Sequence, residues 1–299
     1  MQPGKNSCSQ GELEQMAFET VISCEEASRH LGEAHWVFVD CRSQLMDKQQ
    51  GRNDYLKAHI AGAVYADLDH DLAGPATPSQ TGRHPLPDKD ALTETLSRWG
   101  ISNDAQVVVY DGSVGQMAAA RLWWLLKWAG HAAVAVLDGG FPLWEKSGLP
   151  VQSGIRQNGR AGFRGRFDDT LFVSAEEVLK MSSDPTVLLL DARSADRFRG
   201  ENETIDPVAG HIPNALSAPF ADNISPDGTL KVVDELKRQF ETKIGNTPAG
   251  QVIFYCGSGV TAAQSIVSFV HAGLGMPRFY PGSWSDWIAR KDWPIAKGA

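Results

Sequence analysis

The chain has 299 residues, of which 42% are hydrophobic and 21% charged, and its formal net charge at pH 7 is −8. This length predicts roughly two globular domains of ordinary size. The negative charge argues against nucleic acid or an anionic membrane as a main partner. The cysteines are too few for a disulfide scaffold and lack metal-ligand spacing with histidine, so we expect free thiols and no metal or other cofactor. They are Cys8, Cys24, Cys41 and Cys256.

The first residues, Met1 to Cys8, contain no apolar segment of the kind found in secretory signal peptides. No uninterrupted apolar stretch approaches the roughly 18–20 residues that a membrane-spanning helix needs. We therefore expect a cytoplasmic protein that does not insert into a membrane.

Short apolar runs alternate with helical segments along the first half of the chain. Runs that end in Asp, Cys or Gly are typical of buried parallel strands. Residues 116–128 are predicted to form a helix that ends at Gly130. The segments of this half that recur later are 37–42 (VFVDCR), 59–63 (HIAGA), 107–112 (VVVYDG) and 139–144 (GGFPLW).

The segment 149–169 interrupts this alternation, because it is rich in glycine and arginine and has no apolar periodicity. We interpret it as a linker that packs against acidic domains. A basic binding patch is the alternative interpretation of its arginines.

The second half of the chain repeats the four segments in the same order. A second helix is predicted over 261–272, ending at Gly273. The matching segments are 188–193 (LLLDAR), 211–215 (HIPNA), 252–257 (VIFYCG) and 282–287 (GSWSDW).

The repeat predicts an α/β fold with two tandem domains, 18–148 and 170–295, joined by the linker 149–169. Each domain is expected to hold an open parallel sheet with helices on both faces. Residues found in both copies are expected to be structural, as strand-end charge pairs or in turns. They are Asp40, Arg42, Asp191 and Arg193, together with His59 and His211.

Cys256 has the sequence context of a nucleophile. It follows the predicted strand 252–255 and precedes a glycine-rich turn and a helix. The backbone N–H groups of such a turn and the positive end of the helix dipole favour a thiolate. A buried structural cysteine is the alternative. The first copy has Asp111 at the matching position. Residues that both copies share are therefore expected to serve the fold, and residues found only beside Cys256 are expected to serve the chemistry.

A cysteine-based phosphatase would place an arginine six residues after the cysteine, to bind the phosphoryl group. Ala262 stands at that position, and the loop between contains no charged residue. We therefore consider a phosphatase excluded.

The repeat, the Asp-x-Arg strand ends, the His-Ile turns and the loop Cys-Gly-Ser-Gly-Val-Thr-Ala resemble the two-domain, rhodanese-like sulfurtransferases. The resemblance extends from about Phe18 to Trp293. It implies a tandem rhodanese-like fold, a catalytically silent first domain and a catalytic second domain. The uncharged Gly257 and Ser258 are typical of the 3-mercaptopyruvate sulfurtransferase branch, whereas the thiosulfate branch usually has basic residues there.

The resemblance also implies site residues. Cys256 is expected to carry the persulfide, and Ser258 is expected to act with His84 and Asp69 of the first domain, with Asp67 as an alternative to Asp69. Arg197 is expected to bind the anionic substrate. The remaining loop residues are expected to contact substrate, and they are Gly257, Gly259, Val260 and Thr261.

One expected residue of the mercaptopyruvate branch is missing. A second arginine before the His-Ile-Pro turn is common there, but Thr204 stands at that position. Either the second carboxylate contact is absent or another residue, such as Arg199, provides it.

The sequence thus predicts a sulfurtransferase that moves sulfur from 3-mercaptopyruvate through a Cys256 persulfide, releasing pyruvate. The expected acceptors are cyanide, a small thiol or a reduced thioredoxin-like protein. The alternatives are a thiosulfate sulfurtransferase and a non-enzymatic sulfur carrier or interaction module.

Overall fold

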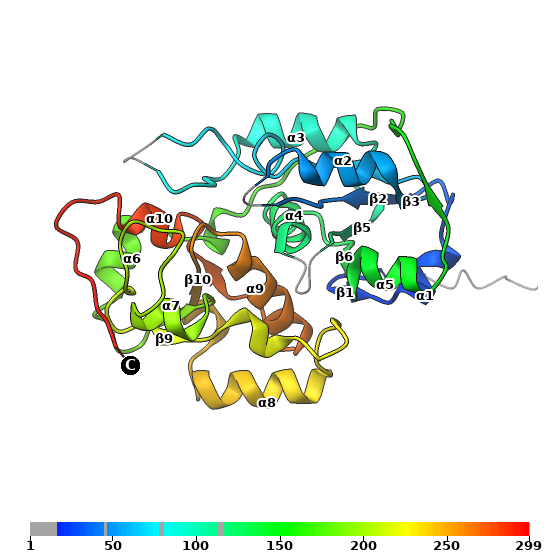
Figure 1. Cartoon of the computed structure of the whole chain (residues 1–299). Helices are drawn as coiled ribbons and strands as arrows, with labels where there is room; N and C mark the ends of the chain where they lie inside the picture. The colour runs from blue at the N-terminus through cyan, green and yellow to red at the C-terminus, as the bar shows by residue number, and fades with distance from the viewer. Residues whose placement is uncertain (1–16, 45–46, 78–80, 113–116, 299) are drawn as a thin grey trace, which may run out of the picture.

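The computed structural model describes residues 17–44, 47–77, 81–112 and 117–298. Cys8 and the N-terminal segment used to exclude a signal peptide lie outside these residues. Figure 1 shows two α/β halves, each built around its own sheet.

The first half contains a parallel sheet with the strand order β1-β6-β5-β2-β4. Its central strand β5 has the sequence Gln-Val-Val-Val-Tyr and is buried throughout, as expected for a strand covered on both faces. The strands are β1 (Val21–Ile22), β2 (Trp36–Asp40), β4 (Val64–Tyr65), β5 (Gln106–Tyr110) and β6 (Val134–Leu137). The helices are α1 (Cys24–Arg29), α2 (Gln50–Lys57), α3 (Lys89–Arg98), α4 (Met117–Trp128) and α5 (Gly140–Lys146).

The second half repeats this plan with the strand order β11-β10-β8-β9, again parallel. The strands are β8 (Leu188–Asp191), β9 (Leu216–Ser217), β10 (Val252–Tyr255) and β11 (Arg278–Phe279). The helices are α6 (Ala175–Met181), α7 (Ala195–Arg199), α8 (Val233–Ile244), α9 (Thr261–His271) and α10 (Ser283–Trp287). Short 3₁₀ turns are η1 (Asp169–Leu171), η2 (Phe220–Asn223) and η3 (Ala249–Gln251).

The predicted fold class is confirmed, and the predicted helix ends agree with the structure. α4 ends at Trp128 and α9 at His271, and Gly130 and Gly273 follow with φ of 79° and 75°, in the left-handed region that favours glycine. The expected first residue of α4, Gln116, lies just outside the described residues.

The shared residues of the two copies make matching structural contacts. Arg42 pairs with Asp40 at 2.7 Å, and Arg193 pairs with Asp191 at 2.6 Å, all four being buried. In the turns, His59 Nδ1 lies 2.8 Å from the carbonyl oxygen of Tyr55, and His211 Nδ1 lies 2.8 Å from that of Phe198. These contacts fix strand ends and turns rather than a reacting centre.

The linker is not a free tether. Its strand β7 (Val151–Gln152) pairs antiparallel with β3 (His59–Ile60), and Arg160 forms an ion pair with Glu94 of α3. The pair of Arg160 with Glu94 is the kind of contact expected for an arginine-rich linker that packs on an acidic domain.

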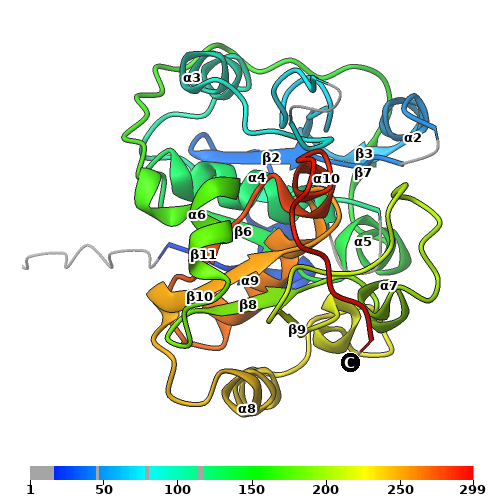
Figure 2. The ribbon, with the colours of Figure 1, turned by 90° about the vertical axis from the view of Figure 1, so that its left-hand side faces the viewer.

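The two halves meet through helices α4 and α9, which Figures 1 and 2 both draw side by side at the junction. Trp124 of α4 is fully buried, and its ring makes an edge contact with Phe279 of β11 at a centroid distance of 4.9 Å. One cluster of buried apolar side chains includes residues of both halves. The loops at the carboxyl ends of the two sheets are thereby held against each other.

Candidate active site

Cys256 follows β10 directly and is only 1% exposed. Its N–H donates to Ser283 Oγ at 3.1 Å, and its carbonyl oxygen accepts from the Trp284 N–H at 2.9 Å. The next carbonyl, of Gly257, accepts from the Ser285 N–H at 2.9 Å. The first residues of α10 therefore hold the cysteine loop in place through these hydrogen bonds.

The cysteine loop, residues 256–260, is mostly buried and contains a set of backbone donors. None of the N–H groups of Gly257, Ser258, Gly259 and Val260 donates to another residue in the described parts of the chain. Gly259 has φ of +73°, and a β-carbon there would lie 2.1 Å from the Pro281 carbonyl oxygen, so the turn requires glycine. Successive free N–H groups next to the first turn of α9 form an environment suited to an anion.

The matching position in the first half illustrates this preference. Asp111 Oδ2 accepts hydrogen bonds from the N–H groups of Ala118 and Ala119 in the first turn of α4, at 3.0 and 3.2 Å. A carboxylate thus occupies the place that Cys256 has in the second half. Both copies place an ionisable residue between a strand and the helix that follows, and only the second copy has sulfur there.

Ser258, His84 and Asp69 come together across the junction between the halves. Ser258 Oγ lies 3.0 Å from His84 Nδ1, and His84 Nε2 lies 3.4 Å from Asp69 Oδ1. Lys48, which was not predicted from the sequence, forms an ion pair of 2.9 Å with Asp69 and so joins this group of interacting side chains. Asp67 instead accepts from the backbone N–H groups of Asp69 and His70, so it shapes the turn and leaves Asp69 beside the histidine.

The protonation states of His84 and Asp69 follow from burial and neighbouring charge. Burial lowers the pKa of His84 to about 4, the charge of Arg121 acts in the same direction, and Asp69 opposes both. Burial also raises the pKa of Asp69, but the hydrogen bond and charge of Lys48 outweigh it and leave that pKa below its ordinary value. His84 is therefore neutral and Asp69 ionised near pH 7, and the imidazole is free to accept a proton.

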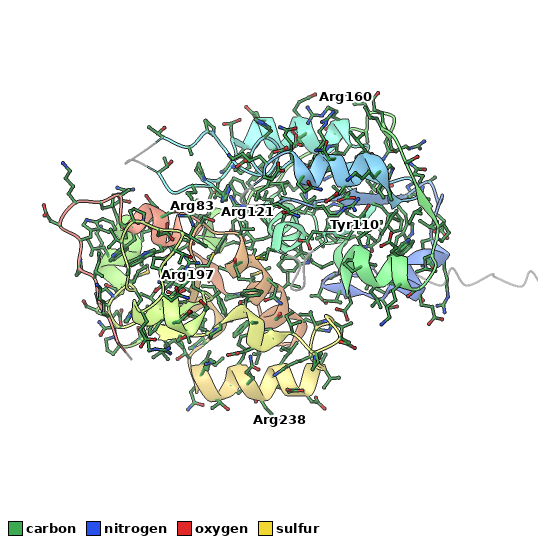
Figure 3. The ribbon with its side chains drawn as sticks, in the orientation of Figure 1. Arg83, Tyr110, Arg121, Arg160, Arg197 and Arg238 are labelled. Atoms are coloured by element: carbon green, nitrogen blue, oxygen red, sulfur yellow. The ribbon has the colours of Figure 1, made fainter. Side chains whose placement is uncertain are left out.

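Two guanidinium groups lie beside Gly257. A β-carbon on Gly257 would lie 3.1 Å from Arg83 Nη2, 3.5 Å from Arg197 Nη2 and 3.7 Å from Asp206 Oδ2. Asp206 forms ion pairs with both arginines, and the one to Arg197 measures 3.0 Å. Arg197 also pairs with Glu203 at 3.0 Å. Figure 3 labels both arginines and places Arg83 where the first half meets the second.

Beside Arg197, the second guanidinium next to the cysteine loop belongs to Arg83, whereas position 204 holds a threonine. Arg199, the substitute suggested from the sequence, pairs instead with the exposed Glu201 at 2.7 Å. Arg83 was missed because it lies in the other half of the chain. The signal for it was its position directly before His84 in the sequence Gly-Arg-His.

Val260 and Thr261 complete the loop where it meets α4. Val260 is 8% exposed, and Thr261 Oγ1 lies 3.5 Å from Met117 Sδ. A cavity of about 330 Å³ in the first half is lined by residues that include Lys48, Asp69, Arg83 and His84. A larger cavity, of about 630 Å³, lies between α2, α3 and the linker and contains none of these site residues.

The other described cysteines lack these features. Burial, followed by the charge of Asp138, raises the pKa of Cys24 to about 11. Burial and nearby aspartates raise the pKa of Cys41 well above its ordinary value. Both side chains are buried, so they are neutral packing residues near pH 7.

Two general features bear on cofactors and membranes. The described residues include no group of three or more His, Cys, Asp or Glu side chains arranged to hold a metal ion. Within the same residues, no helix has the length and apolar character required to cross a bilayer.

Comparison with known proteins identifies the family to which both halves belong. Two segments, 23–147 and 174–290, match the family model of the rhodanese-like domain. A Pseudomonas aeruginosa protein provisionally named a 3-mercaptopyruvate sulfurtransferase is 40% identical over 284 residues, which cover 95% of this chain and all of the relative. A Mycobacterium tuberculosis protein provisionally named a thiosulfate sulfurtransferase is 37% identical over 262 residues, covering 87% of this chain and 90% of the relative.

Among solved structures, the 3-mercaptopyruvate sulfurtransferase SseA of Escherichia coli superimposes with a TM-score of 0.78 at 28% identity. The match covers 90% of this chain and 100% of that one.

Proposed function

The chain belongs to the rhodanese-like family, and we propose that it is a sulfurtransferase that moves sulfur from 3-mercaptopyruvate to an acceptor through a persulfide on Cys256. The observation that carries this proposal is the contact of 3.0 Å between Ser258 and His84, with Asp69 behind the histidine. This arrangement provides a proton path beside the sulfur, which a donor that leaves as an enolate needs and thiosulfate does not.

In the donor step, the Cys256 thiolate attacks the thiol sulfur of 3-mercaptopyruvate. An S–S bond forms, the C–S bond of the donor breaks, and its electron pair goes to the enolate of pyruvate. The thiol proton passes through Ser258 and the neutral His84 to the enolate carbon, which gives pyruvate. The free N–H groups of Gly257, Ser258, Gly259 and Val260 stabilise first the thiolate and then the persulfide anion.

The donor carboxylate is assigned to Arg197 and Arg83. Both guanidinium groups lie against Gly257, directly beside the reacting cysteine. A guanidinium binds a carboxylate with two parallel hydrogen bonds, which orients the donor as well as attracting it.

In the acceptor step, a nucleophile attacks the outer sulfur of the persulfide, the S–S bond breaks, and Cys256 leaves as the thiolate. Cyanide, a small thiol or a reduced thioredoxin-like protein satisfies this chemistry. We assign this step to the cavity lined by Arg83 and His84, because these two residues lie beside Gly257 and Ser258 of the cysteine loop.

Thiosulfate is the second candidate donor, and the name of the M. tuberculosis relative favours it. The loop offers this dianion little charge of its own, since neither Gly257 nor Ser258 is basic. Asp206 further neutralises the two arginines beside the loop. The site therefore fits 3-mercaptopyruvate better.

The test compares kcat/KM for the two donors with cyanide as acceptor, with Cys256→Ser as the inactive control. The proposal expects a preference for 3-mercaptopyruvate, and Ser258→Ala should reduce that activity by roughly 10²-fold or more, as loss of a proton-transfer group does. A preference for thiosulfate would reject the donor assignment but not the class. If intact-mass measurement after donor treatment shows no added sulfur on Cys256, the class itself is rejected.

A further inference from the structure

Arg121 is a buried cation in a mostly apolar helix. It lies in the middle of α4, is fully buried, and has Leu122, Trp123 and Trp124 as its next neighbours. The second half offers an internal comparison, because Ile266 of α9 stands at the corresponding position, counted from Asp111 and Cys256. The corresponding helix of the second half thus packs with an uncharged side chain at this position.

The guanidinium of Arg121 has no carboxylate partner among the residues that the structure describes. It donates instead to backbone carbonyl oxygens, to Gly259 at 2.9 Å, His84 at 3.1 Å, Pro85 at 3.2 Å and Leu72 at 3.4 Å. Carbonyl dipoles satisfy its hydrogen bonds but leave its charge uncompensated, and an uncompensated buried charge destabilises a fold. An anion close to the guanidinium of Arg121 would compensate this charge.

The contacts of Arg121 connect the two parts of the active site. Gly259 belongs to the cysteine loop, and His84 belongs to the segment that reaches Ser258. Figure 3 places Arg121 at the junction of the two halves, next to Arg83. A single side chain of the first half thus holds the loop with the sulfur and the loop with the imidazole together.

We propose that Arg121 is a positioning residue of the catalytic site, supplied by the non-catalytic half, whose counter-ion is the anionic sulfur of Cys256 as thiolate and then as persulfide. The inference rests on the proposed function only in naming the persulfide, since a thiolate is sufficient for its test. It gives the silent first half a defined electrostatic role.

The neighbouring charges support this assignment. Burial lowers the pKa of Arg121 to about 10, and the charge of Cys256 acts in the opposite direction. The other charged groups near the site are already paired with one another. They are Lys48 with Asp69, Arg83 and Arg197 with Asp206, and Arg197 with Glu203.

The first experiment measures the rate at which iodoacetamide alkylates Cys256, by peptide mass spectrometry, across the pH range in which the rate rises. In Arg121→Met we expect the midpoint of this profile to move up by about one pH unit, so that alkylation below the midpoint slows about 10-fold. Arg121→Lys should keep most of the wild-type profile because it keeps the charge. Leu125→Ala, one turn along α4 and also buried, should leave the midpoint unchanged.

A folded Arg121→Met protein with the wild-type profile would overturn the proposal. So would an equal shift in Leu125→Ala, which would show that packing and not charge is responsible. None of these readouts uses a sulfur donor, so a failure here is separate from a failure of the sulfurtransferase proposal.

A second measurement needs no change at Arg121. The quantity measured is the difference in the free energy of unfolding in urea between the wild-type protein and Cys256→Ser. If the thiolate is the counter-ion, this difference should grow in favour of the wild type as the pH rises and the thiolate forms. It should shrink as the pH falls. Cys24→Ser is the matched control, because the pKa of Cys24 is raised to about 11 and its thiol stays neutral. A margin for Cys256→Ser that does not change with pH would contradict the proposal.

Discussion

Asp206 places a buried carboxylate where an anionic sulfur donor is expected to bind. It pairs with Arg83 and Arg197, and the three groups surround Gly257. A donor carboxylate must therefore share the two guanidinium groups with Asp206 or displace it. This competition penalises a dianion more than a monoanion, since each added negative charge meets the same fixed carboxylate.

Replacing Asp206 with asparagine should strengthen binding of both donors. The amide still accepts hydrogen bonds from the arginines but no longer cancels their charge, so we expect KM to fall roughly 10-fold for thiosulfate and less for 3-mercaptopyruvate. Initial-rate kinetics with both donors measure this directly. Glu201→Gln removes a carboxylate from the exposed Arg199 pair and serves as the control. Unchanged or raised KM for both donors would show that the two arginines do not bind the donor.

His84 is the residue whose titration the fold alters in a way that can be measured. Burial lowers its pKa to about 4, so as the pH falls the unfolded chain takes up the proton first, near its ordinary value of about 6.5. Stability attributable to His84 is therefore fully present above that value and lost between about pH 6.5 and 4.

The change His84→Gln should remove this loss. Urea unfolding at several pH values in that interval should show the wild-type protein losing up to about 3 kcal/mol relative to the variant as the pH falls. Asp69→Asn should widen the loss, because Asp69 is the neighbour that raises the pKa of His84. A constant difference between wild type and His84→Gln across the interval would mean that His84 titrates alike in both states.

At the scale of elements, local sequence patterns predicted the fold class and the ends of two helices. The repeat, the buried apolar strands and the glycines after α4 and α9 each report on neighbouring residues, and the structure has the corresponding strands and helix ends. The pairing of β7 with β3 was not foreseen, because a two-residue strand in a glycine-rich segment has no period to detect.

The site was only partly predictable for a related reason. Ser258, His84 and Asp69 are brought together, but their contact joins residues 174 positions apart and was expected only from family resemblance. Arg83 and Arg121 were not predicted, because each makes a contact in the other half of the chain, Arg83 with Asp206 and Arg121 with Gly259. For Arg121 the sequence did contain a signal. It is an arginine among apolar residues of a helix, and the second copy has Ile266 at the corresponding position. Such a residue needs a negatively charged partner from outside its own helix.

At the scale of the whole molecule, the two halves share an apolar cluster and a candidate active site. Trp124 of the first half contacts Phe279 of the second, and the surrounding cluster continues into both. The ion pair of Arg83 with Asp206 and the contact of His84 with Ser258 cross the same junction. The halves are therefore expected to unfold together despite their internal symmetry.

Calorimetry of the full chain should give a single transition whose calorimetric and van't Hoff enthalpies agree. Trp124→Ala should lower stability by about 3–5 kcal/mol and weaken the coupling between the halves, because it removes a buried ring from their junction. Trp144→Ala is the matched control, since this ring is equally buried but packs within the first half and donates to the carbonyl oxygen of Pro150. We expect it to lower the melting temperature while a single transition remains. Two transitions in the wild-type protein would show that the halves fold independently, and that the contacts which bring His84, Arg83 and Arg121 to Cys256 depend on docking of two separately stable units.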